Sequence, residues 1–326
     1  MNRKRNSLSL LLGILVAVLL SPATTHAQAP YKLNGPVLIR PFGDSITYGV
    51  GFTIDANPNC LVAELNQYIC MPPGTAGGGY RGWMTLYSFM QDGIQFTTEG
   101  YQSGGSYAAQ WVVNTQTHDG YPGWTNELLL PKANYNSFSD ITLVHSGTND
   151  MWAIRLKPNP TDQDIDQVAN SAGASLFALL NALLSNNKKA HFFVAQIIKV
   201  SNGSLTPDYQ TINKVIFKYN NYIANNWFNF PPESRARMTL VDMHHTLQAS
   251  DYSPDGIHPN MYGYRKMACT WIRAIRAMTP NQEDPCSGVL SGQEIKKMAP
   301  SKEELKLMNP SKETLELFLK KSSAVK

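Results

Sequence analysis

The sequence carries almost no net charge once its first residues are removed. Arg3, Lys4 and Arg5 account for three of the 28 basic residues, and the remaining 25 face 24 acidic ones. A nucleic-acid footprint needs basic residues gathered on one face, so no nucleic-acid partner is expected. The chain also lacks a Walker pattern, which leaves a nucleotide-binding role without support.

Long apolar runs are scarce as well, and only one suggests a membrane. Leu8–Leu20 is almost purely apolar and lies between three basic residues and a small, polar segment that ends at Ala27. This order is typical of a secretory signal peptide, and the run is shorter than the about 20 residues that span a bilayer. We expect residues 1–27 to be removed and the protein to be secreted or periplasmic, without stable membrane insertion. An uncleaved anchor is the alternative.

Cysteine is rare, with four residues in the whole chain: Cys60, Cys70, Cys269 and Cys286. An even number in an exported chain favours disulfide bonds over metal ligands. Of the three possible pairings we expect Cys60–Cys70 and Cys269–Cys286, because each closes a short local loop. We expect no metal ion and no other cofactor.

Strand and helix signals alternate along the chain. Patterns typical of strands occur at 37–42, 94–98, 140–145, 191–198 and 238–243, and helical patterns occur at 83–91, 161–186, 207–227 and 260–278. Strands alternating with helices predict βαβ units with right-handed crossovers. We therefore expect an α/β protein with a three-layer α/β/α (flavodoxin-like) fold and a five-stranded parallel sheet.

The composition changes near the C-terminus. We expect one domain over residues 28–286, followed by a Lys- and Glu-rich tail over residues 287–326 in which 298–307 is echoed by 308–317. Two short capped helices are predicted there. Charged segments with few apolar residues cannot offset their ordering entropy, so we expect a weakly ordered appendage rather than a tether for a partner.

Two short motifs carry groups that could catalyse acyl transfer. Gly43-Asp44-Ser45 places a hydroxyl at the carboxyl end of a predicted strand, where open α/β sheets bind ligands, although Ser45 could instead cap a helix. In Asp255-Gly-Ile-His258, the imidazole could take the serine proton and the carboxylate could fix its tautomer. The alternative is an aspartate that caps a turn beside a surface histidine.

Taken in order and spacing, three stretches resemble the motifs of the SGNH (GDSL-type) hydrolase superfamily. They are Gly43–Thr47, Gly147–Asp150 and Asp255–Pro259, and the resemblance extends over about Val37–Met278. It implies a serine carboxylic-ester hydrolase that works through an acyl-enzyme, with Ser45, Asp255 and His258 as catalytic residues.

The resemblance also implies three donors for the oxyanion: the backbone N–H groups of Ser45 and Gly123 and the side-chain amide of Asn149. Gly123 lies in His118–Trp124, which is similar to the His-x-Gly-x-x-Gly-Trp run of acetyl xylan esterase-like carbohydrate esterases. Gly100 or Gly104 could take the place of Gly123. Asn149 could be a simple turn residue.

The substrate is the least determined feature. Flat aromatic faces among hydrogen-bonding groups suit sugar rings, and a fatty-acyl tunnel would need a continuous aliphatic lining. We expect Tyr121 and Trp124 to bind a small-molecule or polysaccharide ester with a short acyl group, acetyl above all. The alternatives are a lipolytic GDSL-type esterase or lysophospholipase, an acyltransferase, and a carbohydrate-binding protein without catalysis. We expect a monomer.

Overall fold

The computed structural model describes residues 37–50, 78–84, 96–103 and 117–276. The expected signal peptide and charged tail lie outside the described residues, as do Cys60, Cys70 and Cys286. The expected cleavage and disulfide pairings therefore stay predictions. Cys269 is buried on the last described helix.

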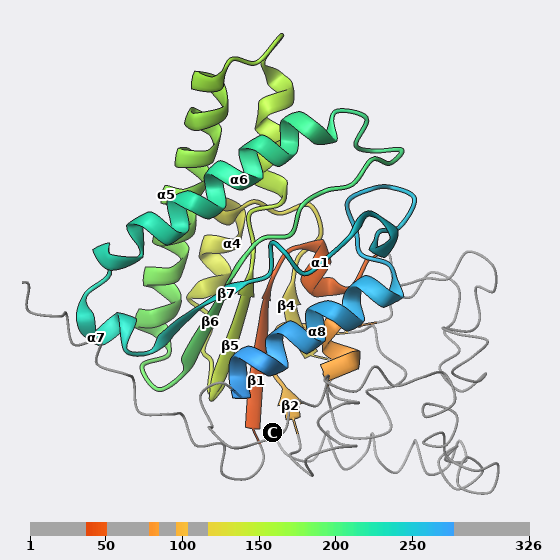
Figure 1. Cartoon of the computed structure of the whole chain (residues 1–326). Helices are drawn as coiled ribbons and strands as arrows, with labels where there is room; N and C mark the ends of the chain where they lie inside the picture. Colours follow the sequence, from red (N-terminus) through yellow and green to blue (C-terminus); the bar gives the residue numbers. More distant parts are fainter. Residues whose placement is uncertain (1–36, 51–77, 85–95, 104–116, 277–326) are drawn as a thin grey trace, which may run out of the picture.

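A mostly parallel sheet forms the middle layer of the protein (Figure 1). Its strands, in chain order, are β1 (Val37–Gly43), β2 (Phe96–Thr98), β3 (Gln102–Ser103), β4 (Thr117–Gly120), β5 (Ile141–His145), β6 (His191–Gln196) and β7 (Met238–Asp242). β1 pairs with β5 along one edge and with β2 and β4 along the other. β6 and β7 continue the sheet on the β5 side.

The strand order confirms the expected flavodoxin-like arrangement. β2 and β4 pair with successive parts of the same edge of β1, so together they occupy one position. The parallel part then reads β2/β4–β1–β5–β6–β7, which is the 2-1-3-4-5 order of flavodoxin-like sheets. The order reverses at β1, and ligands of such sheets bind in the crevice beyond the strand ends at that point.

The sheet contains two strands, β3 and β4, that the sequence did not predict. β3 is antiparallel to β4. The four residues of β4, Thr117-His-Asp-Gly120, include types that are depleted in strands. Tertiary contacts hold the strand in place: Arg40 on β1 forms a buried ion pair of 2.7 Å with Asp119, both side chains being at most 2 % exposed.

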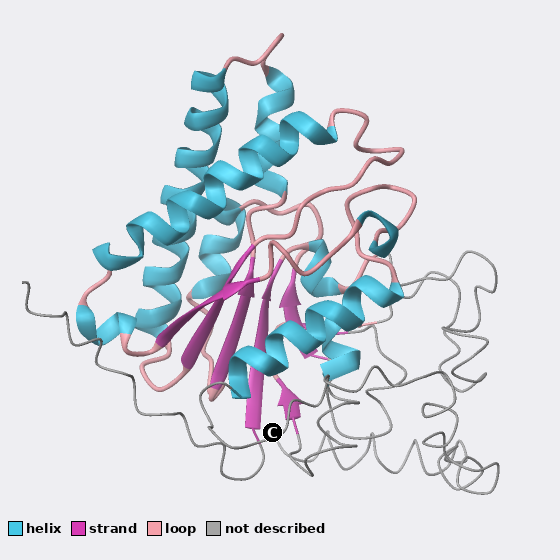
Figure 2. Cartoon of the chain, viewed as in Figure 1, coloured by secondary structure: helices cyan, strands magenta, loops and turns pink. Residues whose placement is uncertain are grey.

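Helices cover both faces of the sheet (Figure 2). On one face lie α4 (Asn126–Ala133), α5 (Asp162–Asn186) and α6 (Tyr209–Asn226), and on the other lies α8 (Met261–Arg276). The short elements are α1 (Ser45–Tyr48), α7 (Pro232–Arg235) and the 3-10 turns η2 (Asn149–Leu156), η3 (Trp227–Asn229) and η4 (Ala249–Asp251). α5 begins as the sequence predicts, because Thr161 and Asp164 form a reciprocal capping box.

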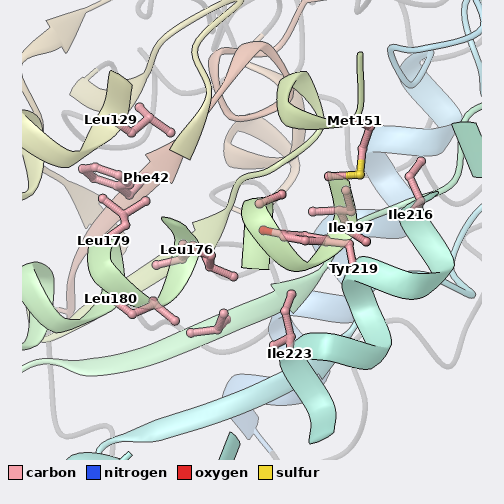
Figure 3. Packing of buried hydrophobic residues seen from close by; sticks show 14 of the residues in the cluster. Phe42, Leu129, Met151, Leu176, Leu179, Leu180, Ile197, Ile216, Tyr219 and Ile223 are labelled. Atoms are coloured by element: carbon pink, nitrogen blue, oxygen red, sulfur yellow. The ribbon is translucent and has the colours of Figure 1, made fainter. Parts of the chain in front are cut away.

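Each face of the sheet has its own apolar core. Figure 3 shows part of the core between the sheet and α4, α5 and α6, where Phe42, Leu176 and Ile223 are fully or almost fully buried. On the opposite face, Trp271 and its neighbours on α8 pack against β5, β6 and β7. Among the described residues, α5 alone is long and apolar enough to cross a membrane, but half of its most apolar stretch is buried inside the protein. Its place in this core accounts for its composition.

Candidate active site

Ser45 begins α1 directly after the carboxyl end of β1. The carboxylate of Asp44 accepts a hydrogen bond of 2.9 Å from the N–H of Ile46 and so caps the helix. A Cβ at Gly43 would lie 2.0 Å from the carbonyl oxygen of His145, so glycine is needed where the ends of β1 and β5 meet. As the first residue of the helix, Ser45 keeps a backbone N–H with no intrahelical acceptor.

The Asp255–His258 segment folds into a turn that holds its own imidazole. One carboxylate oxygen of Asp255 accepts the N–H groups of Ile257 (2.8 Å) and His258 (2.9 Å). The other lies 2.6 Å from His258 Nδ1. Gly256 makes the turn possible, because its φ of 78° lies in the region that favours glycine.

The structure brings this turn to Ser45, 213 residues away in sequence. His258 Nε2 lies 2.8 Å from Ser45 Oγ. Since an ionised carboxylate only accepts hydrogen bonds, Nδ1 carries the proton of the neutral imidazole, and Nε2 is free to accept from the serine hydroxyl. Ser45 is 7 % exposed, and the side chains of His258 and Asp255 are 13 % and 23 % exposed. The three groups form a continuous, partly sheltered chain of hydrogen bonds.

The charge state of Asp255 suits this arrangement. Burial by itself raises the pKa of the carboxyl, but hydrogen bonds from the His258 side chain and from the N–H groups of His258 and Ile257 outweigh it. The net effect is a pKa below the usual value of 3.8. Asp255 is therefore an anion at neutral pH and can stabilise a positive charge that forms on His258.

The two other expected oxyanion donors, Asn149 and Gly123, lie in segments that one hydrogen bond connects through Trp124. Asn149 is the first residue of η2, and its Nδ2 donates to the carbonyl oxygen of Trp124 at 2.9 Å. A side-chain amide has two N–H donors, so one remains for a ligand. Gly123 precedes Trp124 with φ of 79°, and a Cβ there would meet nothing within 4 Å. The turn around Gly123 is therefore open on the side where glycine lacks a side chain.

Gly100 and Gly104 are the two alternatives to Gly123 as an oxyanion donor. A Cβ at Gly100 would lie 2.1 Å from the backbone of His118, so the close approach of the chain to β4 is sufficient reason for glycine there. Gly104 lies outside the described residues.

Tyr121 does not have the position expected of a residue that binds substrate. It is 4 % exposed, its hydroxyl donates to Asp119 at 2.9 Å, and its ring stacks on Trp124 with 4.6 Å between centroids. The expectation that Tyr121 contacts substrate is corrected to a supporting position beneath Trp124. Trp124 is only partly buried.

Sequence reasoning missed Arg81, which lies beneath α1. Its guanidinium donates to the carbonyl oxygens of Thr47 and Tyr48, both at 3.0 Å, at the C-terminal end of the helix. A cation there satisfies open carbonyls and interacts favourably with the helix dipole. The Tyr80 hydroxyl lies 3.1 Å from that of Thr47 and adds a second contact. No local pattern marks Arg81, because its contacts are 33 and 34 residues away.

Two further aspartates lie in the described part of the site. Burial raises the pKa of Asp44 to about 6 and that of Asp150 to about 7, although backbone N–H groups partly offset the effect. Asp150 accepts the N–H of Asn126 at 3.0 Å. In the described part of the chain, no group of three or more His, Cys, Asp or Glu side chains is arranged to hold a metal ion.

The raised pKa of Asp150 predicts how stability depends on pH. In the unfolded chain the group loses its proton near pH 3.8, and in the folded protein near pH 7. Between these values the folded state holds a proton that the unfolded state has lost, so this group removes stability as the pH rises. Melting temperatures from pH 4.5 to 8 should fall less steeply for Asp150→Asn, which keeps an acceptor for Asn126. The control Asp166→Asn, at a partly exposed carboxylate that pairs with Lys218, should keep the wild-type slope. An Asp150→Asn curve parallel to wild type would contradict the assignment.

A family model and several known proteins match the chain. The model for GDSL-like lipases and acylhydrolases matches residues 39–271. A multidomain esterase of Ruminococcus flavefaciens is 26 % identical over an alignment of 301 residues that covers 84 % of this chain and 33 % of that protein. The chain thus spans about a third of the length of this relative.

The solved structures that resemble the chain include a family 3 carbohydrate esterase of Clostridium thermocellum. It has 19 % sequence identity and a TM-score of 0.46, and the match covers 74 % of this chain and 98 % of that one. An acetyl esterase mutant with acetate ion has 20 % identity and a TM-score of 0.48, with coverage of 74 % and 100 %.

Proposed function

The chain belongs to the GDSL-like lipase/acylhydrolase family, and from this premise we propose that it is an esterase with Ser45, His258 and Asp255 as its catalytic triad. One observation carries the proposal: His258 Nε2 lies 2.8 Å from Ser45 Oγ while its Nδ1 lies 2.6 Å from Asp255. Nucleophile, base and orienting carboxylate are thus within hydrogen-bond reach in the order that acyl transfer requires.

The first half of the proposed reaction forms an acyl-enzyme. His258 Nε2 takes the proton of Ser45 Oγ as the oxygen attacks the ester carbonyl, and the carbonyl oxygen becomes an oxyanion. When the tetrahedral intermediate collapses, the bond to the alcohol oxygen breaks, and the imidazolium gives its proton to the leaving alkoxide. Asp255 stabilises the imidazolium throughout and does not itself take the proton.

The second half restores the enzyme. Water enters where the alcohol left, His258 removes one of its protons, and the hydroxide attacks the acyl carbon. The bond to Ser45 Oγ breaks, the serine regains a proton from the imidazolium, and the carboxylic acid leaves. If an acceptor hydroxyl takes the place of water, the same steps transfer the acyl group, so product analysis with a sugar or alcohol acceptor distinguishes hydrolysis from transfer.

The proposed oxyanion hole consists of the N–H groups of Ser45 and Gly123 and the amide of Asn149. The free N–H at the start of α1 and the open turn at Gly123 are suited to an anion, and the Asn149 side chain is anchored to the carbonyl oxygen of Trp124, the residue after Gly123. Because these hydrogen-bond donors are already in place, the site needs no reorganisation when negative charge develops on the carbonyl oxygen.

The proposed substrate is a short-chain ester, acetyl above all, on a carbohydrate. Two features support it: the run from His118 to Trp124 that resembles acetyl xylan esterases, and the partly exposed Trp124 ring next to the proposed oxyanion donors. An indole face beside polar groups can stack on a sugar ring.

A chain-length series tests the substrate. We expect kcat/KM for 4-nitrophenyl esters to fall steeply from C2 to C8, and acetate to be released from acetylated xylan or a related glycan. A profile that peaks at C8 or beyond would reject this substrate class and favour a lipolytic enzyme or lysophospholipase. Turnover that survives Ser45→Ala in the same assay would reject the proposed nucleophile.

We also propose that the protein works outside the cytoplasm after removal of residues 1–27. The basic, apolar and small-residue order of the first 27 residues supports export. N-terminal sequencing of protein recovered from the periplasm or medium should begin just after Ala27 or Ala29. Recovery of the chain only from the cytoplasm, with Met1 or Asn2 at its start, would contradict export.

A further inference from the structure

The loop between β6 and α6 lies directly against the Asp255–His258 turn (Figure 1). We name residues 201–208 the strap. Three of its N–H groups donate to carbonyl oxygens of the turn region: Ser201 to Gly256 (2.7 Å), Ser204 to Pro254 (3.0 Å) and Leu205 to Asp255 (3.1 Å). The strap therefore contacts the backbone of the turn region at three successive carbonyl groups, those of residues 254–256.

The contact is so close that it needs glycine on both sides. A Cβ at Gly203 would lie 2.3 Å from the backbone nitrogen of Gly256 and 2.6 Å from the carbonyl oxygen of Asp255. A Cβ at Gly256 would lie 2.1 Å from the hydroxyl oxygen of Thr206. The strap and the Asp255–His258 turn are therefore in direct backbone contact, so a displacement of one moves the other.

Thr206 closes the strap. Its side chain is fully buried, and its hydroxyl donates to the carbonyl oxygen of Ser201 at 2.6 Å while lying 3.3 Å from that of Asp255. The Thr206 N–H donates to the carbonyl oxygen of Gly203 at 3.1 Å. One side chain thus fixes the curvature of the strap and contacts the backbone of the carboxylate that orients His258.

Both ends of the strap are anchored to the rest of the fold. Before it, the side chain of Asn213 on α6 both donates to and accepts from the backbone of Val200, at 2.8 and 2.9 Å. At its other end, Arg155 on η2 forms a two-point ion pair with Asp208 and donates to the carbonyl oxygen of Leu205 at 2.6 Å. Because η2 also begins with Asn149, the strap connects the element of that proposed oxyanion donor to the turn of the proposed base.

We propose that Thr206 is a positioning residue, which acts through the strap to hold the Asp255–His258 turn at the distance from Ser45 that proton transfer requires. The inference rests on the proposed triad and deepens it. The hydrogen bonds within the turn fix His258 relative to Asp255, but they do not fix the turn relative to β1. The strap supplies a second constraint, on the position of the turn. The reaction rate is sensitive to this position, because a misplacement of a catalytic group by about 1 Å can lower the rate about 10²-fold.

Two substitutions test the strap. Thr206→Val keeps the shape of the side chain but removes the hydroxyl, and Gly203→Ala pushes a methyl group into the turn from a partly exposed position in the loop. With 4-nitrophenyl acetate, each should lower kcat on the order of 10- to 10²-fold, with KM changed by no more than about threefold. Thr206→Ser, which restores the hydroxyl, should return kcat to within about threefold of wild type.

A matched control separates positioning from general stability. Thr142 on β5 is as buried as Thr206, and its hydroxyl lies 3.2 Å from that of Ser139, at the start of the strand and away from the proposed triad. Thr142→Val should lower the melting temperature and leave kcat within about twofold.

The proposal is overturned if Thr206→Val and Gly203→Ala both keep kcat within about twofold of wild type, if Thr206→Ser is as slow as Thr206→Val, or if Thr142→Val loses as much kcat as Thr206→Val. If Thr206→Val does not fold, Gly203→Ala decides. Activity that survives the single substitution Ser45→Ala would instead refute the triad, and this outcome distinguishes failure of the proposed function from failure of the strap.

Discussion

Replacing Ser45 with alanine should reduce kcat for 4-nitrophenyl acetate by about 10⁶, and replacing His258 with alanine should cost about as much. The hydroxyl is a weak nucleophile until the imidazole 2.8 Å away takes its proton, so neither group works alone. The double variant should lose little more than either single one, because the two side chains act as one unit. Single-turnover and steady-state rates of the purified variants measure this directly.

Two exposed positions provide controls. Ser171→Ala on the outer side of α5 and His245→Ala after β7 change the same residue types away from the site, and both should keep wild-type kcat. Near-normal turnover in His258→Ala would mean that the base is misassigned, and additive losses in the double variant would mean that the two groups act independently.

The second large effect is expected for Asp255→Asn, at about 10⁴ in kcat. The amide keeps an oxygen to accept the N–H groups of Ile257 and His258, so the turn should persist. In the variant, an uncharged amide replaces the carboxylate that faces His258 Nδ1. The loss of the negative charge disfavours both the required tautomer of the imidazole and the imidazolium. The melting temperature should therefore change little while the rate falls.

The chain supplies a matched control for this change. Asp242 and His245 form the same i, i+3 contact, with 2.8 Å between carboxylate and Nδ1, but on an exposed segment. Asp242→Asn should leave kcat unchanged. If Asp255→Asn loses less than about tenfold, the carboxylate is not the group that orients His258.

Local chemistry made some parts of the site predictable. Asp255 and His258 are three residues apart, so a turn that joins them follows from short-range geometry, and the structure has that turn. The strand before Ser45 is marked by the apolar residues 37–39 and by Phe42, and it ends in glycine. The meeting of the two segments across 213 residues follows from the order of the strands, and only the resemblance to a family with that order suggested it.

Other parts could not be predicted because their causes are not local. β4 is a polar stretch made into a strand by the ion pair between Arg40 and Asp119 and by pairing with β1. Tyr121 and Trp124 look equivalent in sequence, but only the packing shows that Tyr121 is buried under Trp124. Thr206 lies in an ordinary polar loop, and its significance depends on which backbone that loop touches.

Covalent trapping of the nucleophile is the most direct test of the central claim, which is that His258 activates Ser45. A small organophosphorus fluoride should add one phosphoryl group per chain, release fluoride, stop hydrolysis of 4-nitrophenyl acetate, and map by peptide mass spectrometry to Ser45. Ser45→Ala should take up none, and His258→Ala should be labelled far more slowly than wild type. A label on another residue, or equal labelling rates in wild type and His258→Ala, would contradict the account.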